Sequence, residues 1–215
     1  MVVSNTPAIG IIATEESLIP RLKTLTEIYG GKPDILSITD NILDGRKESD
    51  VEGLMCISPP TDKVLKLLSS AVDIDLPILA IGPGLEALNI VFGGTSAVAV
   101  EGHEPKVKDD LLQASKHRIY IAPGSKLAAI LGSGGVVMVN SHHRLGLHEA
   151  QKSLSLLASA YSLSDGVIEA VESPSHSWII GVQFSPDRKL EVPPQFERLF
   201  GSLVHRASIR QTCSR

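Results

Sequence analysis

The chain has 215 residues, of which 43% are hydrophobic, 20% charged and 4% aromatic, and its formal net charge is −4. This length suits one three-layer α/β domain that buries a large core without disulfides or metals. The basic residues are dispersed and form no cationic stretch, so the composition argues against nucleic acid as a partner.

The cysteine usage and the N-terminus predict a cytoplasmic protein. Cys56 lies in an apolar run and Cys213 near the C-terminus, so a disulfide framework is not expected. The first residues lack a basic region and are interrupted by Pro7, which favours a first strand over a signal peptide. No apolar stretch has the length needed to cross a bilayer, so we expect no membrane partner.

The first half alternates short apolar runs with helical patterns, which is typical of a doubly wound sheet. Strands are expected at 8–12, 34–38, 53–57 and 77–81, a loop at 39–50, and helices at 17–29, after Thr61 or Asp62, and from Gly82-Pro83-Gly84 to Gly93-Gly94. The buried helix faces are predicted to carry Leu22, Leu25 and Ile28 in the first helix and Leu65, Leu68 and Val72 in the second.

The second half favours mixed or antiparallel strands. They are expected at 96–101, 118–121, 135–139, 154–161, 166–172 and 177–183. Ser125 is predicted to cap a short helix, and a C-terminal helix begins near Pro193 with Phe196, Leu199, Phe200, Leu203 and Val204 along one stripe. We therefore expect one domain over 1–215, with a core at about 6–207 and a flexible tail at 208–215.

The run LPILAIGPGLEALNIVFGGTS at 76–96 contains a strand, a tight turn, a helix and a double-glycine stop. It resembles the nucleophile elbow of class I glutamine amidotransferases, especially of the gamma-glutamyl-gamma-aminobutyrate hydrolase group. The residues that match are Gly84, Leu88, Asn89, Gly93, Gly94 and Thr95.

Further blocks are similar to that family in the same order along the chain. They are APGSKLAAILG at 122–132, VNSHHR at 139–144, SDGVIEAVE at 164–172 and SWIIGVQFSPD at 177–187. The resemblance spans most of the chain. It implies a three-layer, doubly wound, flavodoxin-like α/β fold with a mostly parallel central sheet and extra antiparallel strands in the second half.

The same resemblance implies that the catalytic residues are missing. The family's nucleophilic cysteine falls on Gly82, its histidine base on Ser185 and its orienting glutamate on Asp187. Amide hydrolysis by this route needs a nucleophile, a base and a group that orients the base. Glycine has no side chain, and a serine hydroxyl is a poor proton acceptor at neutral pH.

The oxyanion donors are also predicted to be lost. In elbow enzymes one donor is the backbone N–H after the nucleophile, and that residue here is Pro83. The second donor of the family aligns with Ser58-Pro59, where Pro59 again has no N–H. Losing one such donor costs about 10²–10³ in turnover, and losing the triad costs on the order of 10⁶.

Other reactive residues have plainer interpretations. Cys56 is expected to be a core residue rather than a relocated nucleophile. His142, His143 and His148 form a cluster in which adjacent histidines point to opposite sides, so we predict no metal and no cofactor. Glu169 and Glu172 are expected to be exposed on opposite sides of a strand.

The turn after the fourth strand lies where folds of this kind bind ligands. Residues considered for ligand binding are Gly84, Glu86, His142, His143 and Glu169, and a purely structural turn is the alternative. A small amino-acid-like compound is the expected ligand.

Three hypotheses about function remain open from the sequence. The first is a catalytically inactive binding, regulatory or scaffolding subunit with a protein partner. The second is a hydrolase of a small amide or gamma-glutamyl compound that uses a rearranged site with His142 or His143, Ser185, Asp187 and, as one option, a bound metal. The third is an assembly role as a homodimer. A histidine nitrogen in hydrogen-bond reach of Ser185 would favour the second.

Overall fold

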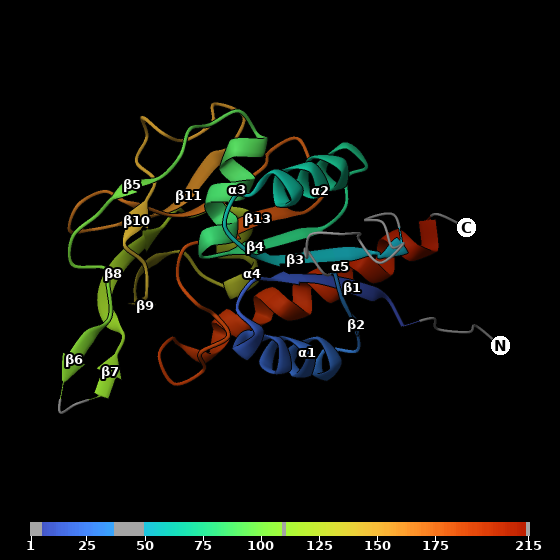
Figure 1. The fold of residues 1–215 in the computed structure, drawn as a ribbon, viewed down its shortest axis with the longest axis horizontal. Coiled ribbons are helices and arrows are strands. Elements are labelled where there is room, and N and C mark those ends of the chain that lie inside the picture. Colours follow the sequence, from blue (N-terminus) through green and yellow to red (C-terminus); the bar gives the residue numbers. More distant parts are fainter. Residues whose placement is uncertain (1–5, 37–49, 109–110, 214–215) are drawn as a thin grey trace.

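The first half of the chain forms alternating strands and helices in a computed structural model, which describes residues 6–36, 50–108 and 111–213 (Figure 1). In chain order the elements are β1 (Ala8–Ala13), the 3₁₀ helix η1 (Glu16–Leu18), α1 (Ile19–Ile28), β2 (Lys32–Ile35), β3 (Gly53–Ile57), α2 (Asp62–Asp73), β4 (Ile78–Ile81) and α3 (Pro83–Val91). Every residue of β3 and β4 is buried, as parallel strands between two helix layers require.

The second half is richer in strands. It contains β5 (Val98–Ala99), β6 (Lys106–Lys108), β7 (Leu111–Gln113), β8 (Ser115–Ile121), α4 (Lys126–Leu131), β9 (Gly135–Ser141), β10 (Leu145–Gly146), β11 (Leu157–Ser162), β12 (Ile168–Glu172), β13 (Ile179–Val182), the 3₁₀ helix η3 (Pro194–Glu197) and α5 (Arg198–Cys213). All six expected strand segments contain a strand, whereas β6, β7 and β10 were not predicted.

Within the described residues, the main sheet has nine strands in the order β2-β1-β3-β4-β13-β12-β11-β8-β9. β2, β1, β3, β4 and β13 are parallel, and the remaining strands extend the sheet in antiparallel fashion. Helices α2 and α3 cover one face, and α1, α4 and α5 cover the other, each over its own apolar core (Figure 1). The predicted fold class is confirmed.

Three helix predictions are confirmed in detail. Thr61 caps α2, because its hydroxyl accepts the Val64 N–H at 3.3 Å, and Ser125 caps α4 by accepting the Ala128 N–H at 3.0 Å. The apolar stripe of the C-terminal helix is buried throughout, from Phe196 to Val204. Capping residues and a 3.6-residue stripe are local signals, so the sequence alone reveals them.

The predicted faces of the first two helices need correction. Ile28 is 59% exposed, and Thr26 is buried beside Leu22 and Leu25 instead. From Leu22 to Ile28, two steps of three residues fall short of two full turns by about a third of a turn, which rotates Ile28 off the buried face. In α2 the buried stripe is Val64, Leu67, Leu68 and Ala71, which leaves Leu65 and Val72 at its margins.

Two boundaries also differ from the predictions. β2 begins at Lys32 and includes Pro33, which an edge strand tolerates, whereas the predicted strand began at Asp34. Residues 208–213, expected to be a frayed tail, continue α5 as helix. The predicted loop at 39–50 lies almost wholly outside the described residues. Across those residues we find no helix with the length and apolarity that a membrane span needs.

Several residues that match the elbow motif make hydrogen bonds at the C-terminal end of α3. The Asn89 side-chain amide donates to the carbonyls of Thr95 and Gln151, both at 2.9 Å, and its Oδ1 accepts the Ser153 N–H at 2.8 Å. A Cβ on Gly94 would lie 2.3 Å from this amide, so only glycine fits there. The Asn-Gly-Gly-Thr pattern therefore joins α3 to the loop before β11.

We expect Asn89→Ala to destabilise the chain by about 3 kcal/mol. The substitution leaves the buried Ser153 N–H and the Thr95 carbonyl without their Asn89 partner, and it removes one of the two hydrogen bonds to the Gln151 carbonyl, which still accepts the Thr95 N–H. Urea unfolding followed by circular dichroism measures this. Gln151→Ala is the control: it removes one side-chain acceptor of a backbone N–H, that of His148 at 3.3 Å, and keeps the Gln151 carbonyl. Equal stability of the two variants would contradict the role given to Asn89.

Candidate functional site

The turn between β4 and α3 has the backbone of a strand-to-helix elbow. Gly82 has φ +55° and ψ −116°, a region that L-residues enter only with strain. A Cβ placed on Gly82 would find its nearest heavy atom, the Gln183 carbonyl oxygen, at 4.0 Å. A residue with a side chain would be strained here, whereas glycine adopts this conformation at little cost, and the position that a side chain would occupy is open.

Gly84 fixes this turn against the neighbouring strand. A Cβ on Gly84 would lie 2.1 Å from the Cys56 carbonyl oxygen, so the first turn of α3 packs directly on the end of β3. This contact holds Gly82 at the carboxyl ends of the parallel strands, where open α/β sheets bind ligands.

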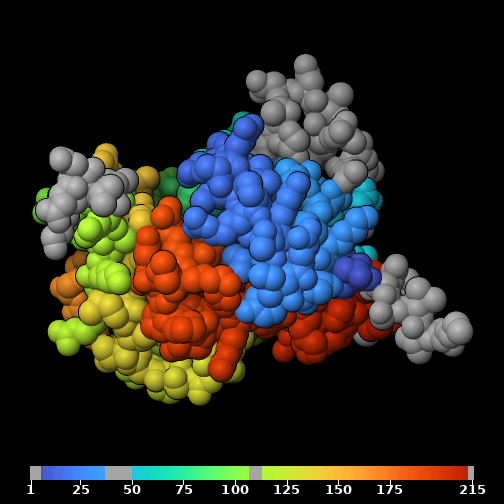
Figure 2. All heavy atoms as spheres, turned by 90° about the horizontal axis from the view of Figure 1, so that it is seen from below, coloured from blue at the N-terminus to red at the C-terminus, as the bar shows by residue number. Residues whose placement is uncertain are grey.

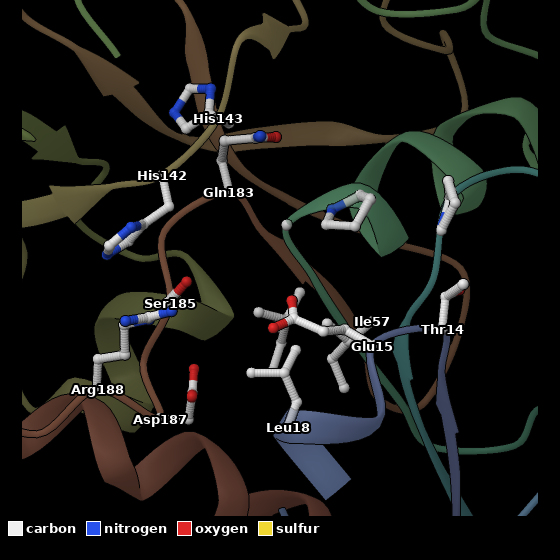
Figure 3. Close-up of a pocket in the computed structure, with 14 residues that line it drawn as sticks. Thr14, Glu15, Leu18, Ile57, His142, His143, Gln183, Ser185, Asp187 and Arg188 are labelled. Carbon is white, nitrogen blue, oxygen red and sulfur yellow. The ribbon is translucent and has the colours of Figure 1, made fainter. Parts of the chain in front are cut away.

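A cavity of about 270 Å³ opens at this point (Figure 3). Its walls come from the residues that follow β1, β3, β4 and β13, together with the loop after β9. They are Thr14, Glu15, Leu18, Ile57, Pro59, Ile81, Gly82, Pro83, His142, His143, Gln183, Ser185, Asp187 and Arg188. Seven residues singled out in the sequence, from Pro59 to Asp187, thus meet around one cavity.

Ser185 and Asp187 are held by partners other than a histidine. The Asn140 amide clamps the Ser185 backbone: Oδ1 accepts the Ser185 N–H at 2.9 Å and Nδ2 donates to the Ser185 carbonyl at 3.1 Å. The Asp187 carboxylate is buried and accepts a hydrogen bond from Arg21 of α1 at 2.8 Å. In Figure 2 the orange segment after β13 lies against the blue N-terminal part of the chain.

The two adjacent histidines point apart, as predicted. The His142 Nε2 donates to the Glu191 carboxylate at 2.6 Å. Burial alone would raise the pKa of Glu191, but the hydrogen bonds from His142 and Asn140 lower it below its usual value. Among the described residues, no histidine nitrogen hydrogen-bonds to the Ser185 hydroxyl, which is the contact that the rearranged-site hypothesis requires.

Three other candidate ligand residues lie outside the cavity wall. Gly84 is buried under β3, and the Glu86 carboxylate accepts the Ala97 N–H at 2.9 Å, so both serve the packing of α3. Glu169 and Glu172 were expected to be exposed, and both are buried. They do lie on different sides of β12: Glu172 accepts N–H groups at the start of α4, whereas Glu169 contacts histidines.

The Glu169 carboxylate belongs to a cluster that the sequence did not reveal. His103, from the loop after β5, and His143 place ring nitrogens near its Oε1, and these three residues have the composition of a metal site. His117 and Asp165 surround them. The five residues are spread over some 65 positions of the chain, so no ligand spacing could indicate the cluster.

Several cavity residues were also not predicted. Thr14 and Glu15 follow β1, and Arg188 follows the block at 177–187. The first two carried a usable signal, since residues directly after parallel strands meet at one edge of the sheet. Arg188 carried none, because its position depends on how the chain turns after β13.

Cys56 is fully buried in β3 and does not line the cavity. Burial raises the pKa of its thiol to about 12, although a weak contact of Sγ with the Ser58 carbonyl lowers it slightly. A thiol is nucleophilic only as the thiolate. The expectation that Cys56 is a core residue is confirmed.

The family model of peptidase C26 matches residues 57–187. This span begins at the end of β3 and includes Gly82, Ser185 and Asp187. The chain belongs to the peptidase C26 family. Its match to the family covers the elbow and most of the cavity wall.

Two curated relatives have names that refer to glutamine amidotransfer or to gamma-glutamyl hydrolysis. The chain is 32% identical over 152 residues to a protein named "putative glutamine amidotransferase" from Mycobacterium tuberculosis, covering 66% of this chain and 44% of the relative. It is 27% identical over 131 residues to gamma-glutamyl-gamma-aminobutyrate hydrolase from Escherichia coli O157:H7, covering 57% and 50%. The chain spans about half the length of these relatives.

The fold has solved counterparts among glutaminase domains. The glutaminase domain of Trypanosoma brucei CTPS, solved with bound acivicin, superposes with a TM-score of 0.71 at 16% identity. The match covers 95% of this chain and 94% of that one. At this identity the likeness concerns the fold, which it shares with other class I glutamine amidotransferase domains.

We expect Cys56 to resist an alkylating reagent at pH 8 in the native protein, because a pKa of about 12 leaves roughly one thiolate in 10⁴ and burial blocks access. In guanidinium chloride the same residue should react fully. Peptide mass spectrometry separates its label from that on Cys213. Rapid native labelling of Cys56 would show that the thiol is accessible.

Proposed function

We propose that this member of the peptidase C26 family does not hydrolyse amides and acts as a binding or regulatory subunit. The observation that carries the proposal is Gly82. It occupies the elbow at the mouth of the parallel strands, with open space where a side chain would stand and no side chain to fill it. According to the sequence resemblance, class I glutamine amidotransferases have their nucleophilic cysteine at the position of Gly82.

The surroundings of Gly82 support the same conclusion. Pro83 and Pro59 both line the cavity, and neither has an N–H that could stabilise an oxyanion. Ser185 stands at the position of the base in the resemblance, and its backbone is clamped by Asn140. Asp187, at the position of the orienting glutamate, is paired with Arg21.

The alternative, a hydrolase with a rearranged site, has weaker support. It needs a histidine that can take a proton from Ser185, but His142 donates to Glu191, and the Nε2 of His143 faces His103 at 3.2 Å. It also needs an oxyanion site, which the two prolines do not supply. We therefore keep the inactive function as the proposal.

The cavity wall favours a small zwitterionic ligand, such as an amino acid or a gamma-glutamyl compound. The Arg188 guanidinium, which also lies 3.6 Å from the Glu191 carboxylate, can pair with a ligand carboxylate, and Glu15 offers a carboxylate to an ammonium group. His142, Ser185 and Thr14 add hydrogen-bonding groups, while Leu18, Ile57 and Ile81 supply apolar surface. A few polar groups over an apolar base are typical of small-molecule sites.

The protein partner or second copy that such a subunit would regulate, and its place in the cytoplasm, remain predictions from the sequence.

We expect the purified protein to show no turnover above background with glutamine or with gamma-glutamyl-gamma-aminobutyrate. Gly82→Cys should remain at background too, because the base and the oxyanion donors would still be missing. Ammonia or amine release, measured over hours at high enzyme concentration, tests both variants. Mass spectrometry should show that the new thiol is alkylated in the native state, since position 82 faces the cavity.

Turnover by the unmodified protein would overturn the proposal. The Cys56→Ala variant then shows whether the Cys56 thiol is the nucleophile: if turnover disappears in this variant, catalysis belongs to a thiol that becomes exposed. Denatured samples and the solvent background serve as controls for spontaneous hydrolysis.

For the ligand, we expect titration calorimetry with glutamate, glutamine and γ-aminobutyrate to detect binding of at least one compound. Arg188→Ala should weaken it about 10- to 100-fold, as expected for loss of a charge-assisted hydrogen bond. Lys189→Ala is the matched control, because Lys189 pairs with Glu197 at 3.0 Å and lies outside the cavity wall. Equal losses in both variants, or no binding at all, would contradict the assignment.

A further inference from the structure

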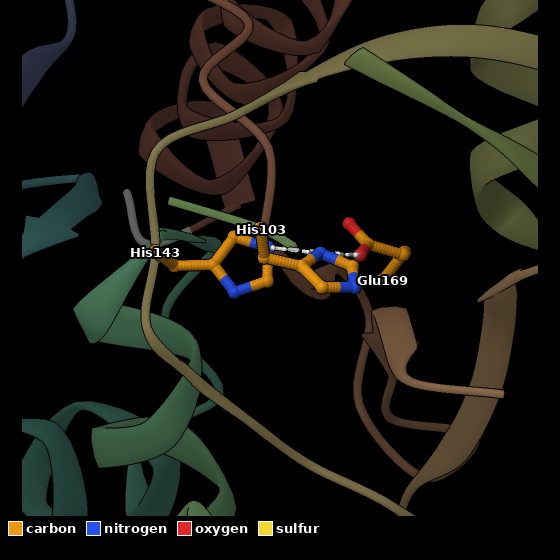
Figure 4. A group of neighbouring side chains, drawn as sticks. All are labelled: His103, His143 and Glu169. Atoms are coloured by element: carbon orange, nitrogen blue, oxygen red, sulfur yellow. Dashed lines mark hydrogen bonds and ion pairs between the residues drawn. The ribbon is translucent and has the colours of Figure 1, made fainter. Parts of the chain in front are cut away.

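Three ring and carboxylate atoms converge on one point beside the cavity (Figure 4). His103 Nδ1 lies 3.2 Å from His143 Nε2, and each of these nitrogens lies 3.7 Å from Glu169 Oε1. A point equidistant from three atoms with these separations lies roughly 2.1 Å from each, close to the bond lengths of about 2.0–2.2 Å that zinc makes to nitrogen and oxygen.

The outer nitrogens of both histidines already have acceptors. His103 Nε2 lies 2.8 Å from the Asp165 carboxylate, and His143 Nδ1 lies 2.9 Å from the Leu145 carbonyl. An N–H must therefore occupy each outer position, so the inner nitrogens, His103 Nδ1 and His143 Nε2, face each other at 3.2 Å. These two nitrogens can be held together by a shared proton or by a metal ion that both of them bind.

The neighbouring Ser141 and His117 donate no hydrogen to these two inner nitrogens. The Ser141 hydroxyl lies 3.3 Å from His103 Nδ1, but it donates its single hydrogen to the His103 carbonyl at 2.6 Å. His117 Nε2 reaches Glu169 Oε1 at 2.9 Å. The other carboxylate oxygen of Glu169 and the Nδ1 of His117 are buried without any hydrogen-bond partner.

The Glu169 carboxylate is fully buried, and its Oε1 faces the ring nitrogens of His103, His117 and His143. A buried carboxylate beside two inward-facing ring nitrogens is a favourable environment for a cation.

We propose that His103, His143 and Glu169 bind one Zn²⁺ ion, with a fourth tetrahedral position left to water or a small anion. Two imidazole nitrogens and one carboxylate oxygen are a donor set that zinc accepts. Asp165 and the Leu145 carbonyl hold the two rings in the required tautomers, as outer partners of metal-binding histidines do.

Such an ion would join three segments that are distant in the sequence. It would tie the loop before β6 and the loop after β9 to β12, a central strand of the sheet. His143 also lines the cavity, so the ion would fix that wall in place. The inferred site does not depend on whether the protein hydrolyses amides.

The test uses tag-free full-length protein stripped with a chelator. Titration calorimetry with ZnCl₂ should show one tight site per chain, and Zn²⁺ should raise the melting temperature. Co²⁺ should give the visible absorption of a tetrahedral complex.

Variants locate the site. His143→Ala and Glu169→Gln should each weaken zinc binding at least about 100-fold, and Asp165→Asn about 10- to 100-fold through the orientation of His103. His142→Ala is the matched control and should bind zinc normally, because its ring bonds to Glu191 on the other side of the chain. Circular dichroism checks that each variant is folded.

Absence of tight zinc binding by the folded protein would overturn the proposal. In that case the contact between His103 Nδ1 and His143 Nε2 would be explained by a shared proton. Binding that survives both His143→Ala and Glu169→Gln, or that is lost in His142→Ala, would place the metal elsewhere. Should the two ligand variants fail to fold, Asp165→Asn and the Co²⁺ spectrum decide the question.

Discussion

The packing of α3 against the end of β3 is the contact on which the site depends. Gly84 lets the first turn of the helix approach the Cys56 carbonyl so closely that no side chain would fit between them. That approach bends the chain sharply at Gly82 and places the turn at the carboxyl ends of β1, β3, β4 and β13. Without it, the elbow and the cavity would not coincide.

Around this turn, the residues that hold the fold together are different from the residues that face the cavity. The motif residues behind α3 are retained because they pack and hydrogen-bond: Asn89 joins three backbone groups, and Gly94 leaves room for its amide. These contacts explain why the family is recognisable although the elbow carries glycine followed by proline. A fold can keep its motif for structural reasons while the residues facing the cavity change.

Buried charge is distributed unevenly between the two sides of the cavity. On one side, Asp187 is paired with Arg21, and Glu191 with His142, so each carboxylate has an obvious partner. On the other side, Glu169 lies among three histidines, and one of its oxygens has no partner. This imbalance within the described residues is the physical basis for the proposed cation site.

The sequence alone determined the features that depend on local pattern. Thr61 and Ser125 cap helices because a hydroxyl there reaches an N–H three residues on, and the stripe from Phe196 to Val204 follows from helical periodicity. The order of strands and helices also followed from local pattern, and the family resemblance placed Gly82 and Ser185 in one site. The sequence did not indicate that β13, which leads to Ser185, pairs in parallel with β4.

Only the tertiary structure decided which distant side chains meet. Glu169 was expected to face solvent, yet it is buried, because β11 and β13 flank its strand and the loops carrying His103 and His143 fold over it. The partner of Asp187 is on α1, 166 residues away. Contacts of this kind depend on how loops close over the sheet, and that closure leaves no periodic trace in the sequence.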